Sequence, residues 1–209
     1  MSAHAPALRL KSDASVAQSW RMSVTTRPQA KRERRVLPPL DGPALDRMAL
    51  RYVERFATTR GRLTDYLKRK IRERGWDGAT VDPRAVAERM AELGYVDDRA
   101  YAEARASAMT RRGLGARRIA GAFHQAGIDE ADRQAVAPAI AESAGSAALA
   151  FARRRRLGPW ASEVPDKATA QRQIAAMLRA GHRFDLARRI VAMLPGDMAD
   201  PDNFDQDRQ

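Results

Sequence analysis

Cationic side chains are the residues of this sequence whose spacing most clearly suggests chemistry. Four arginines surround a turn that contains Gly113 and Gly115. Glycine permits close backbone approach, and guanidinium groups beside a helix N-terminus suit phosphate or carboxylate. We predict an anion-binding contact surface here, with a solvated structural turn as the alternative. The four arginines are Arg111, Arg112, Arg117 and Arg118.

Two further cationic sets lie on predicted helices. The run 153–156 consists of four arginines. If Ala148, Phe151 and Ala152 face the core, helical geometry turns Arg155 inward and leaves Arg153, Arg154 and Arg156 for a partner. The other set projects away from an apolar stripe of an earlier helix and could meet phosphates; it comprises Arg62, Lys68, Arg69 and Arg72.

Aromatic side chains next to these cations raise the possibility of stacking on single-stranded bases. Trp76 and Trp160 are predicted to lie in loops beside basic helices, which makes them the best candidates. The remaining aromatics considered keep helical spacing and are predicted to be core residues; they are Tyr52, Phe56, Tyr101 and Phe123.

The sequence offers little for catalysis or for binding a cofactor or metal. It contains no cysteine, and His4, His124 and His182 are far apart without carboxylates at ligand spacing. No phosphate loop of the GxxxxGK type and no nucleophile elbow occurs. We therefore predict a protein that is not an enzyme, with no catalytic residue, cofactor or metal.

The composition of the chain limits the kinds of partner and the cellular location that we expect. The 209 residues carry 38 Lys and Arg against 26 Asp and Glu, a formal charge of +12 that favours a polyanionic partner. No apolar run approaches the ~20 residues of a membrane span. Together with the absence of cysteine, this predicts a protein of the reducing cytoplasm that does not enter membranes.

Helical periodicity is continuous from Pro43 onward, and no period-two segment interrupts it, so the fold is predicted to be all-α. Candidate caps are Asp82, Asp97, Asp129 and Asp166. We make four predictions for the later helices. Pro138 should shorten or kink the sixth helix, and a break near Gly145 should precede a seventh at Ala147–Leu157. The eighth should end at Gly181, and the ninth should run through Leu194.

An internal repeat organises these helices. Gly75, Gly127 and Gly181 each follow a basic amphipathic helix and lie 52 and 54 residues apart. Two apolar residues that lie four positions apart precede each glycine. In the third copy this pair, Ile174 and Leu178, lies one residue closer to the glycine than in the other two, a one-residue slip. We predict three tandem three-helix repeats stacked into an elongated, curved module. The predicted repeats span 41–94, 95–141 and 142–194, and the first differs by a longer loop before its third helix.

The middle repeat carries a family resemblance. GYVDDRAYA at 94–102 and RRGLGARRIAGAFHQAGI at 111–128 resemble the signature of the bacterial RecX family, modulators of the RecA recombinase. The resemblance covers about Ala44 to Leu194. It implies three tandem three-helix repeats, and binding along the groove of the RecA filament on single-stranded DNA, with inhibition of recombinase and coprotease activities. It further predicts a monomer that acts in DNA repair, recombination and the SOS response.

The resemblance also assigns motif residues by position. We expect a mainly structural role, in which Tyr101 and Ala102 pack and Asp97 caps a helix. The matched structural positions are Gly94, Tyr95, Asp97, Asp98, Tyr101, Ala102, Gly113, Gly115, Ile119, Phe123 and Gly127.

Both chain ends lie outside the shared pattern. Residues 1–40 hold eight basic and two acidic residues and are predicted to be a disordered arm; a transit peptide, or a start at Met22, are alternatives. Residues 195–209 hold five Asp and one Arg, a net of 1 − 5 = −4. They are predicted to form a disordered acidic tail that shields the basic surface. The alternative function is direct nucleic-acid binding by helix-turn-helix-like units without the recombinase.

Overall fold

The computed structural model describes residues 38–201 and Phe204. Within this part the chain forms nine α-helices, one short 3-10 helix and no strand, so the all-α prediction is confirmed. The predicted basic arm, apart from residues 38–40, lies outside the described residues, as do positions 202–203 and 205–209 of the predicted tail.

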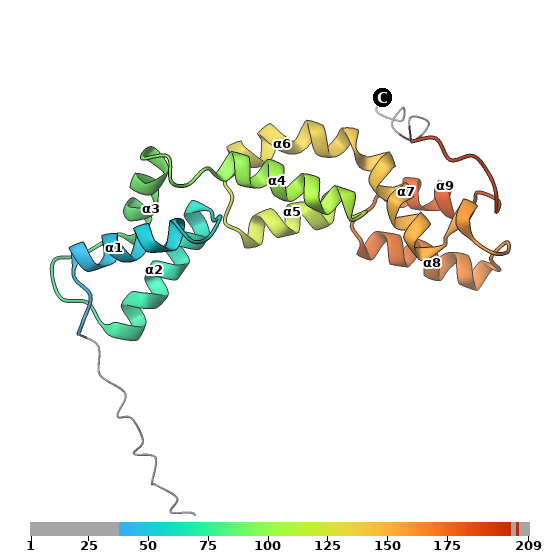
Figure 1. The fold of residues 1–209 in the computed structure, drawn as a ribbon. Helices are drawn as coiled ribbons and strands as arrows, with labels where there is room; N and C mark the ends of the chain where they lie inside the picture. The colour runs from blue at the N-terminus through green and yellow to red at the C-terminus, as the bar shows by residue number, and fades with distance from the viewer. Residues whose placement is uncertain (1–37, 202–203, 205–209) are drawn as a thin grey trace, which may run out of the picture. The chain divides into compact units, whose positions relative to one another are not determined.

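The helices fall into three consecutive groups of three (Figure 1). The first group contains α1 (Gly42–Val53), α2 (Arg60–Arg74) and α3 (Pro83–Glu92). The second contains α4 (Asp98–Arg111), α5 (Ala116–Gln125) and α6 (Glu130–Glu142). The third contains α7 (Ala144–Arg155), the 3-10 helix η1 (Gly158–Trp160), α8 (Lys167–Arg179) and α9 (Phe184–Val191).

Six helices begin at a side chain that caps the first turn. Each cap accepts a hydrogen bond from a backbone amide that has no partner within the helix, which stabilises a helix by about 1 kcal/mol. Asp82, Asp97, Asp129 and Asp166 cap α3, α4, α6 and α8, as the sequence predicts. The remaining caps are Asp41 for α1 and Thr59 for α2.

Each group buries its own apolar cluster, because every helix turns one stripe inward. Leu45, Leu63 and Leu67 are fully buried in the first group. Ile119 and Phe123 anchor the second cluster. In the third cluster the fully buried side chains include Met177, Ala187 and Ile190.

Met177 corrects the predicted repeat pattern. It lies four residues before Gly181, as Phe123 lies four before Gly127, and it is fully buried. Leu178, which the sequence pattern favoured, is only half-buried. The one-residue slip is therefore absent at this position, whereas Ile174 packs against the third cluster as predicted.

Three other expectations for the later helices compare differently with the structure. Pro138 does not shorten α6, which continues to Glu142. The break expected near Gly145 lies at Ser143, so α7 begins three residues earlier than predicted and contains the buried Gly145. The ninth helix ends at Val191, which leaves Leu194 outside it and exposed.

Phe56 is also misassigned by its spacing. It follows the end of α1 and is 52% exposed, because the chain leaves the helix after Val53 and turns toward α2. Its ring lies against Tyr52, with the two centroids 5.3 Å apart. Tyr52 and Tyr101 are half-buried and Phe123 is buried, in keeping with their predicted core positions.

Candidate partner interface

The predicted basic face of α2 is exposed, but its members have different surroundings. Arg62 donates a hydrogen bond to the Tyr101 hydroxyl at 2.5 Å and lies over the Tyr101 ring. Arg69 forms a 3.7 Å ion pair with Glu73. Lys68 and Arg72 have no ion pair or hydrogen bond within the described part of the chain. Arg62 therefore connects the first group to α4, whereas Lys68 and Arg72 remain open to a partner.

The glycine turn between α4 and α5 packs against the third group. Gly113 and Gly115 are buried, and a Cβ added to Gly113 would lie 2.7 Å from the backbone nitrogen of Phe151. The Gly115 amide donates to the Ala180 carbonyl at 2.9 Å, and the Arg117 amide donates to the Gly181 carbonyl at 3.2 Å.

These contacts correct one part of the sequence interpretation. Backbone amides at the start of an α-helix and carbonyls at its end have no partner within the helix. Here amides at the start of α5 donate hydrogen bonds to carbonyls just beyond the end of α8. The glycines thus bring two protein backbones together, and the Gly115 and Arg117 amides, which could have faced a phosphate, are already bonded. The side chains that an anion can approach are those of Arg111, Arg112, Arg117 and Arg118, which are all exposed.

A related contact joins the first two groups. Gly61, near the start of α2, meets Gly127 just beyond α5; a Cβ on Gly61 would lie 2.7 Å from the Gly127 Cα. The Thr59 hydroxyl donates to the Ala126 carbonyl. We call this contact the first junction, and the Gly115–Gly181 contact the second junction.

An ionic cluster centred on Arg60 reinforces the first junction. Asp98 accepts from the Arg60 backbone amide at 2.8 Å and from its Nε at 3.2 Å. The same guanidinium contacts Asp129 at 2.8 Å and Asp132 at 3.0 Å. Sequence reasoning missed Arg60, because its partners lie 38, 69 and 72 residues away; the carboxylates at the starts of α4 and α6 were the only available signal.

The charges in this cluster shift one another's protonation. Burial opposes the charged form of Arg60, but hydrogen bonding and attraction from Asp98, with smaller contributions from Asp129 and Asp132, leave the pKa of Arg60 raised. Burial and the neighbouring Asp129 carboxylate raise the pKa of Asp132. The hydrogen bond from the Asp132 amide and the charge of Arg60 lower the pKa of Asp129 despite partial burial.

A buried histidine reinforces the second junction instead. His182 is 2% exposed, and its Nε2 lies 3.1 Å from the Gly113 carbonyl. A carbonyl can only accept, so Nε2 carries the proton and donates. Burial lowers the pKa of His182, which the Gly113 hydrogen bond only partly opposes. The ring is therefore held neutral.

Two of the predicted arginine sets meet beside this junction. Arg154 of α7 donates to the Arg111 carbonyl at the end of α4 at 3.4 Å. Arg153 and Arg156 are exposed, and Arg156 ends α7 in the left-handed conformation with φ 55°. The structure thus joins the turn arginines to the α7 arginines through Arg111 and Arg154, while the α2 cations belong to the first group.

Arg155 departs from the prediction that it turns toward the core. It is exposed, and its guanidinium lies 5.9 Å from the centroid of the Phe151 ring one helical turn earlier. The long side chain covers the half-buried ring and keeps its charge in water.

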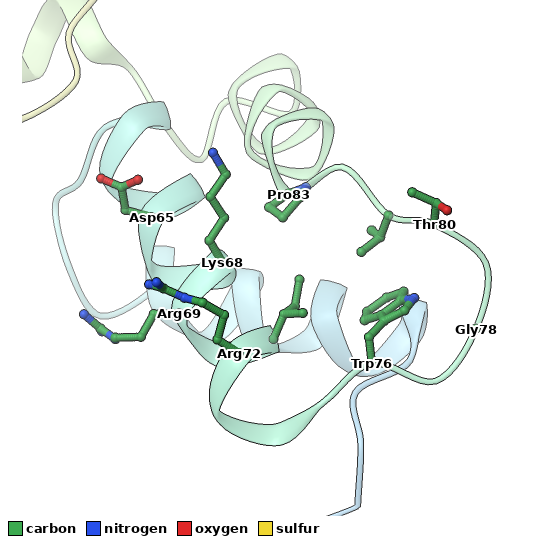
Figure 2. Close-up of a pocket in the computed structure, with 10 residues that line it drawn as sticks. Asp65, Lys68, Arg69, Arg72, Trp76, Gly78, Thr80 and Pro83 are labelled. Atoms are coloured by element: carbon green, nitrogen blue, oxygen red, sulfur yellow. The ribbon is translucent and has the colours of Figure 1, made fainter.

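The candidate stacking residues are both half-buried. Trp160 packs against the third cluster. Trp76 packs against the first, and its indole N–H donates to the Ala79 carbonyl at 2.7 Å. Trp76 also lines an open pocket with a volume of about 850 Å³ (Figure 2).

The start of the predicted acidic tail has defined contacts. The Gly196 amide donates to the Pro159 carbonyl at 2.9 Å, and Asp197 accepts from the Leu194 amide at 2.7 Å. Phe204 is half-buried against the third cluster, with Arg189 over its ring at 4.9 Å. It also lines a hollow at the second junction with Arg117 and Arg183.

The described residues contain neither a candidate metal site nor a single helix that could span a membrane. Among residues 38–201 and Phe204, no group of three or more histidine, aspartate or glutamate side chains could hold a metal ion. In the same part of the chain no single helix is long and apolar enough to cross a membrane, and one bent pair, Glu130–Glu142 with Ala144–Trp160, passes by length and composition alone.

This architecture defines a class: an all-helical protein of consecutive three-helix groups, with exposed arginines near the second junction and exposed cations along α2. The chain belongs to the RecX family of regulatory proteins. It is 31% identical over 176 residues to the regulatory protein RecX of Myxococcus xanthus, covering 79% of this chain and 91% of the relative.

Further comparisons agree on the family and the fold. Regulatory protein RecX of Agrobacterium fabrum is 29% identical, with 69% of this chain and 80% of the relative covered. Regulatory protein RecX of Thermobifida fusca is 32% identical, with 69% and 75% covered. The crystal structure of RecX from Lactobacillus salivarius shares the fold, with a TM-score of 0.51 at 17% identity, covering 71% of this chain and 93% of that one. No family model matches the chain.

Proposed function

We propose that this protein is a non-enzymatic regulator that binds the RecA recombinase assembled on single-stranded DNA. It would occupy the filament groove as a cytoplasmic monomer and inhibit the recombinase and coprotease activities. The similarity to regulatory RecX proteins over most of their length supports a regulatory role. The observation that carries the proposal is the group of exposed arginines around the second junction.

The chemistry of these arginines suits a filament of protein and nucleic acid. Guanidinium groups form bidentate bonds with both carboxylates and phosphates, so one cationic surface can contact both components. The hydrogen bond from Arg154 to the Arg111 carbonyl, above the closely packed second junction, restricts the Arg154 side chain. A preorganised surface loses less side-chain freedom on binding than flexible cations do.

The test compares filaments with naked DNA. We would titrate the protein against RecA filaments on single-stranded DNA, and against free single- and double-stranded DNA, at two salt concentrations, and follow ATPase and strand exchange. Tighter binding to filaments, with inhibition below one protein per recombinase, is expected. Equal affinity for naked DNA would favour the alternative of direct nucleic-acid binding, for which the charge of +12 and the exposed cations of α2 argue.

A pair of charge reversals addresses the surface itself. Arg118 and Arg153 are exposed and make no side-chain ion pair among the described residues, so R118E/R153E should leave folding intact. We expect filament affinity to fall about tenfold or more. The control R47E/R51E makes the same change of net charge on exposed positions of α1. Equal losses in both variants would reject this surface and indicate long-range attraction only.

A further inference from the structure

The longer loop of the first group builds a pocket for which the proposed function gives no role. Eight residues separate α2 from α3, whereas four separate α5 from α6 and four separate α8 from α9. The additional residues carry Trp76, Gly78, Thr80 and Val81, which line the 850 Å³ pocket together with α2 (Figure 2).

The loop is held in place at its start. The Leu40 amide donates to the Gly75 carbonyl at 3.0 Å, and the Asp77 amide donates to the Leu40 carbonyl at 2.8 Å. Leu40 is fully buried. With the indole N–H of Trp76 bonded to Ala79, the ring has a fixed position. The pocket is therefore preformed, as ligand sites commonly are.

The pocket combines an apolar floor with a cationic rim. Half-buried apolar side chains of the floor, Ile71, Trp76 and Val81, pack against the first core cluster. Pro83 extends the floor at the start of α3, and Figure 2 shows it across the hollow from Arg72. The rim carries Lys68, Arg69 and Arg72 against the single carboxylate of Asp65.

We infer that this pocket binds an acidic peptide segment of a protein partner, with one large apolar side chain inserted beside Trp76. Charge complementarity selects the acidic flanks, because neither Lys68 nor Arg72 forms a close ion pair within residues 38–201 and Phe204. The floor selects the apolar anchor, since burying such a side chain is the main source of affinity at small interfaces.

A peptide fits these observations better than single-stranded nucleic acid. Sequence-tolerant strand binding uses several aromatic platforms along a basic groove. Here Trp76 is the single aromatic residue among those that line the pocket, and its ring also packs on the core. One apolar hollow with cations on its rim suits one inserted side chain with charged neighbours.

The experiment uses the full chain carrying W20F and W160F, which leaves Trp76 as the only tryptophan. The probe is a fluorescein-labelled nine-residue peptide of alternating Glu and Asp with one central Phe. A second peptide has Ser at the centre, and a twelve-nucleotide oligothymidylate serves as the nucleic-acid arm. Anisotropy gives the affinity, and Trp76 emission measured with unlabelled ligands locates the binding.

We expect the Phe peptide to bind at least tenfold more tightly than the Ser peptide and to shift Trp76 emission. K68E/R72E should abolish binding, whereas R105E/R179E, which makes the same charge change at exposed positions of α4 and α8, should retain it. Equal binding of the Phe and Ser peptides overturns the inference. So does tighter binding of the oligothymidylate with a shift of Trp76 emission, which would make the pocket a nucleic-acid site. No recombinase is present, so failure here leaves the proposed filament binding unaffected.

Discussion

The first and second junctions each place a glycine at the start of one helix against the glycine that closes a helix of the next group. Around this shared backbone contact the side chains differ. The first junction surrounds Gly61 and Gly127 with the charged cluster of Arg60 and three aspartates. The second surrounds Gly115 and Gly181 with direct backbone hydrogen bonds and the neutral ring of His182. Both junctions thus require close approach of two backbones, whereas the side-chain and backbone interactions that stabilise each junction differ.

The largest expected effect comes from filling the second junction. Gly181 has φ +97°, and an added Cβ would lie 2.5 Å from the Arg118 amide nitrogen. Gly181→Ala should therefore lower the free energy of unfolding by roughly 3 kcal/mol or more, since backbone strain and overlap act together. Urea denaturation followed by circular dichroism measures it.

Gly94→Ala is the matched control for that substitution. Gly94 also has a positive φ, +79°, but nothing lies within 4 Å of its added Cβ. We expect a loss of only about 1 kcal/mol from the left-handed conformation. If the two alanine variants were equally stable, steric closeness at the second junction would contribute nothing.

Removing the ionic centre of the first junction should have the next largest effect. Arg60→Ala leaves the Asp98 side chain, 2% exposed, without its main charged partner. A buried unpaired carboxylate destabilises strongly, so we expect a loss of about 3 kcal/mol. Arg84→Ala breaks an exposed pair with Glu88 and should cost less than about 0.5 kcal/mol. Similar losses in both would mean that the cluster adds no more than a surface pair.

The neutral histidine predicts a pH dependence specific to the second junction. The pKa of His182 is lowered in the folded protein, and the unfolded value is about 6.5, so below that pH the unfolded state binds more protons. Stability should be fully present above about pH 6.5 and should fall as pH drops toward the folded-state pKa. Denaturation at pH 7.5, 6.5 and 5.5 should show a larger loss for the wild type than for His182→Gln. Parallel curves would contradict this account.

The smallest expected effect concerns the cover over the second junction. Phe204 is half-buried and its ring contacts Arg189. Phe204→Ala should lower stability by about 1 kcal/mol, the scale of one partly buried aromatic contact. Met198→Ala is the control, because Met198 is 96% exposed and should change little. Thermal denaturation distinguishes the two variants.

What the sequence could predict was local. Asp82 and Asp97 were identifiable as caps because a cap and its amide lie two or three residues apart. The role of Gly115 in joining two groups and the Arg60 cluster depend on residues 38 to 72 positions away, and no periodicity records them. The exposed arginines were found by composition, but their grouping required the contact between Arg111 and Arg154. The predictions that Phe56 is a core residue and that Leu194 lies in the ninth helix were wrong, because α1 and α9 end before the helical spacing of apolar residues in the sequence ends.

The capping of α8 has a consequence for how many such groups this chain can join. The first turns of α2, which Thr59 also caps, and of α5 meet the end of a helix in the following group. No further group follows α8 among the described residues, and Asp166 accepts a hydrogen bond from its Thr169 amide at 2.6 Å. At the other end of the series, the Gly75 carbonyl is taken by Leu40. The helices α2, α5 and α8 are the second helices of their groups. At the C-terminal end of α2 and at the N-terminal end of α8, neighbouring residues of the same chain therefore bond backbone groups that a further group could otherwise have used. A stack built from self-complementary ends would be prone to add further copies; the local bonds at Gly75 and in the first turn of α8 leave fewer free backbone groups for such an addition.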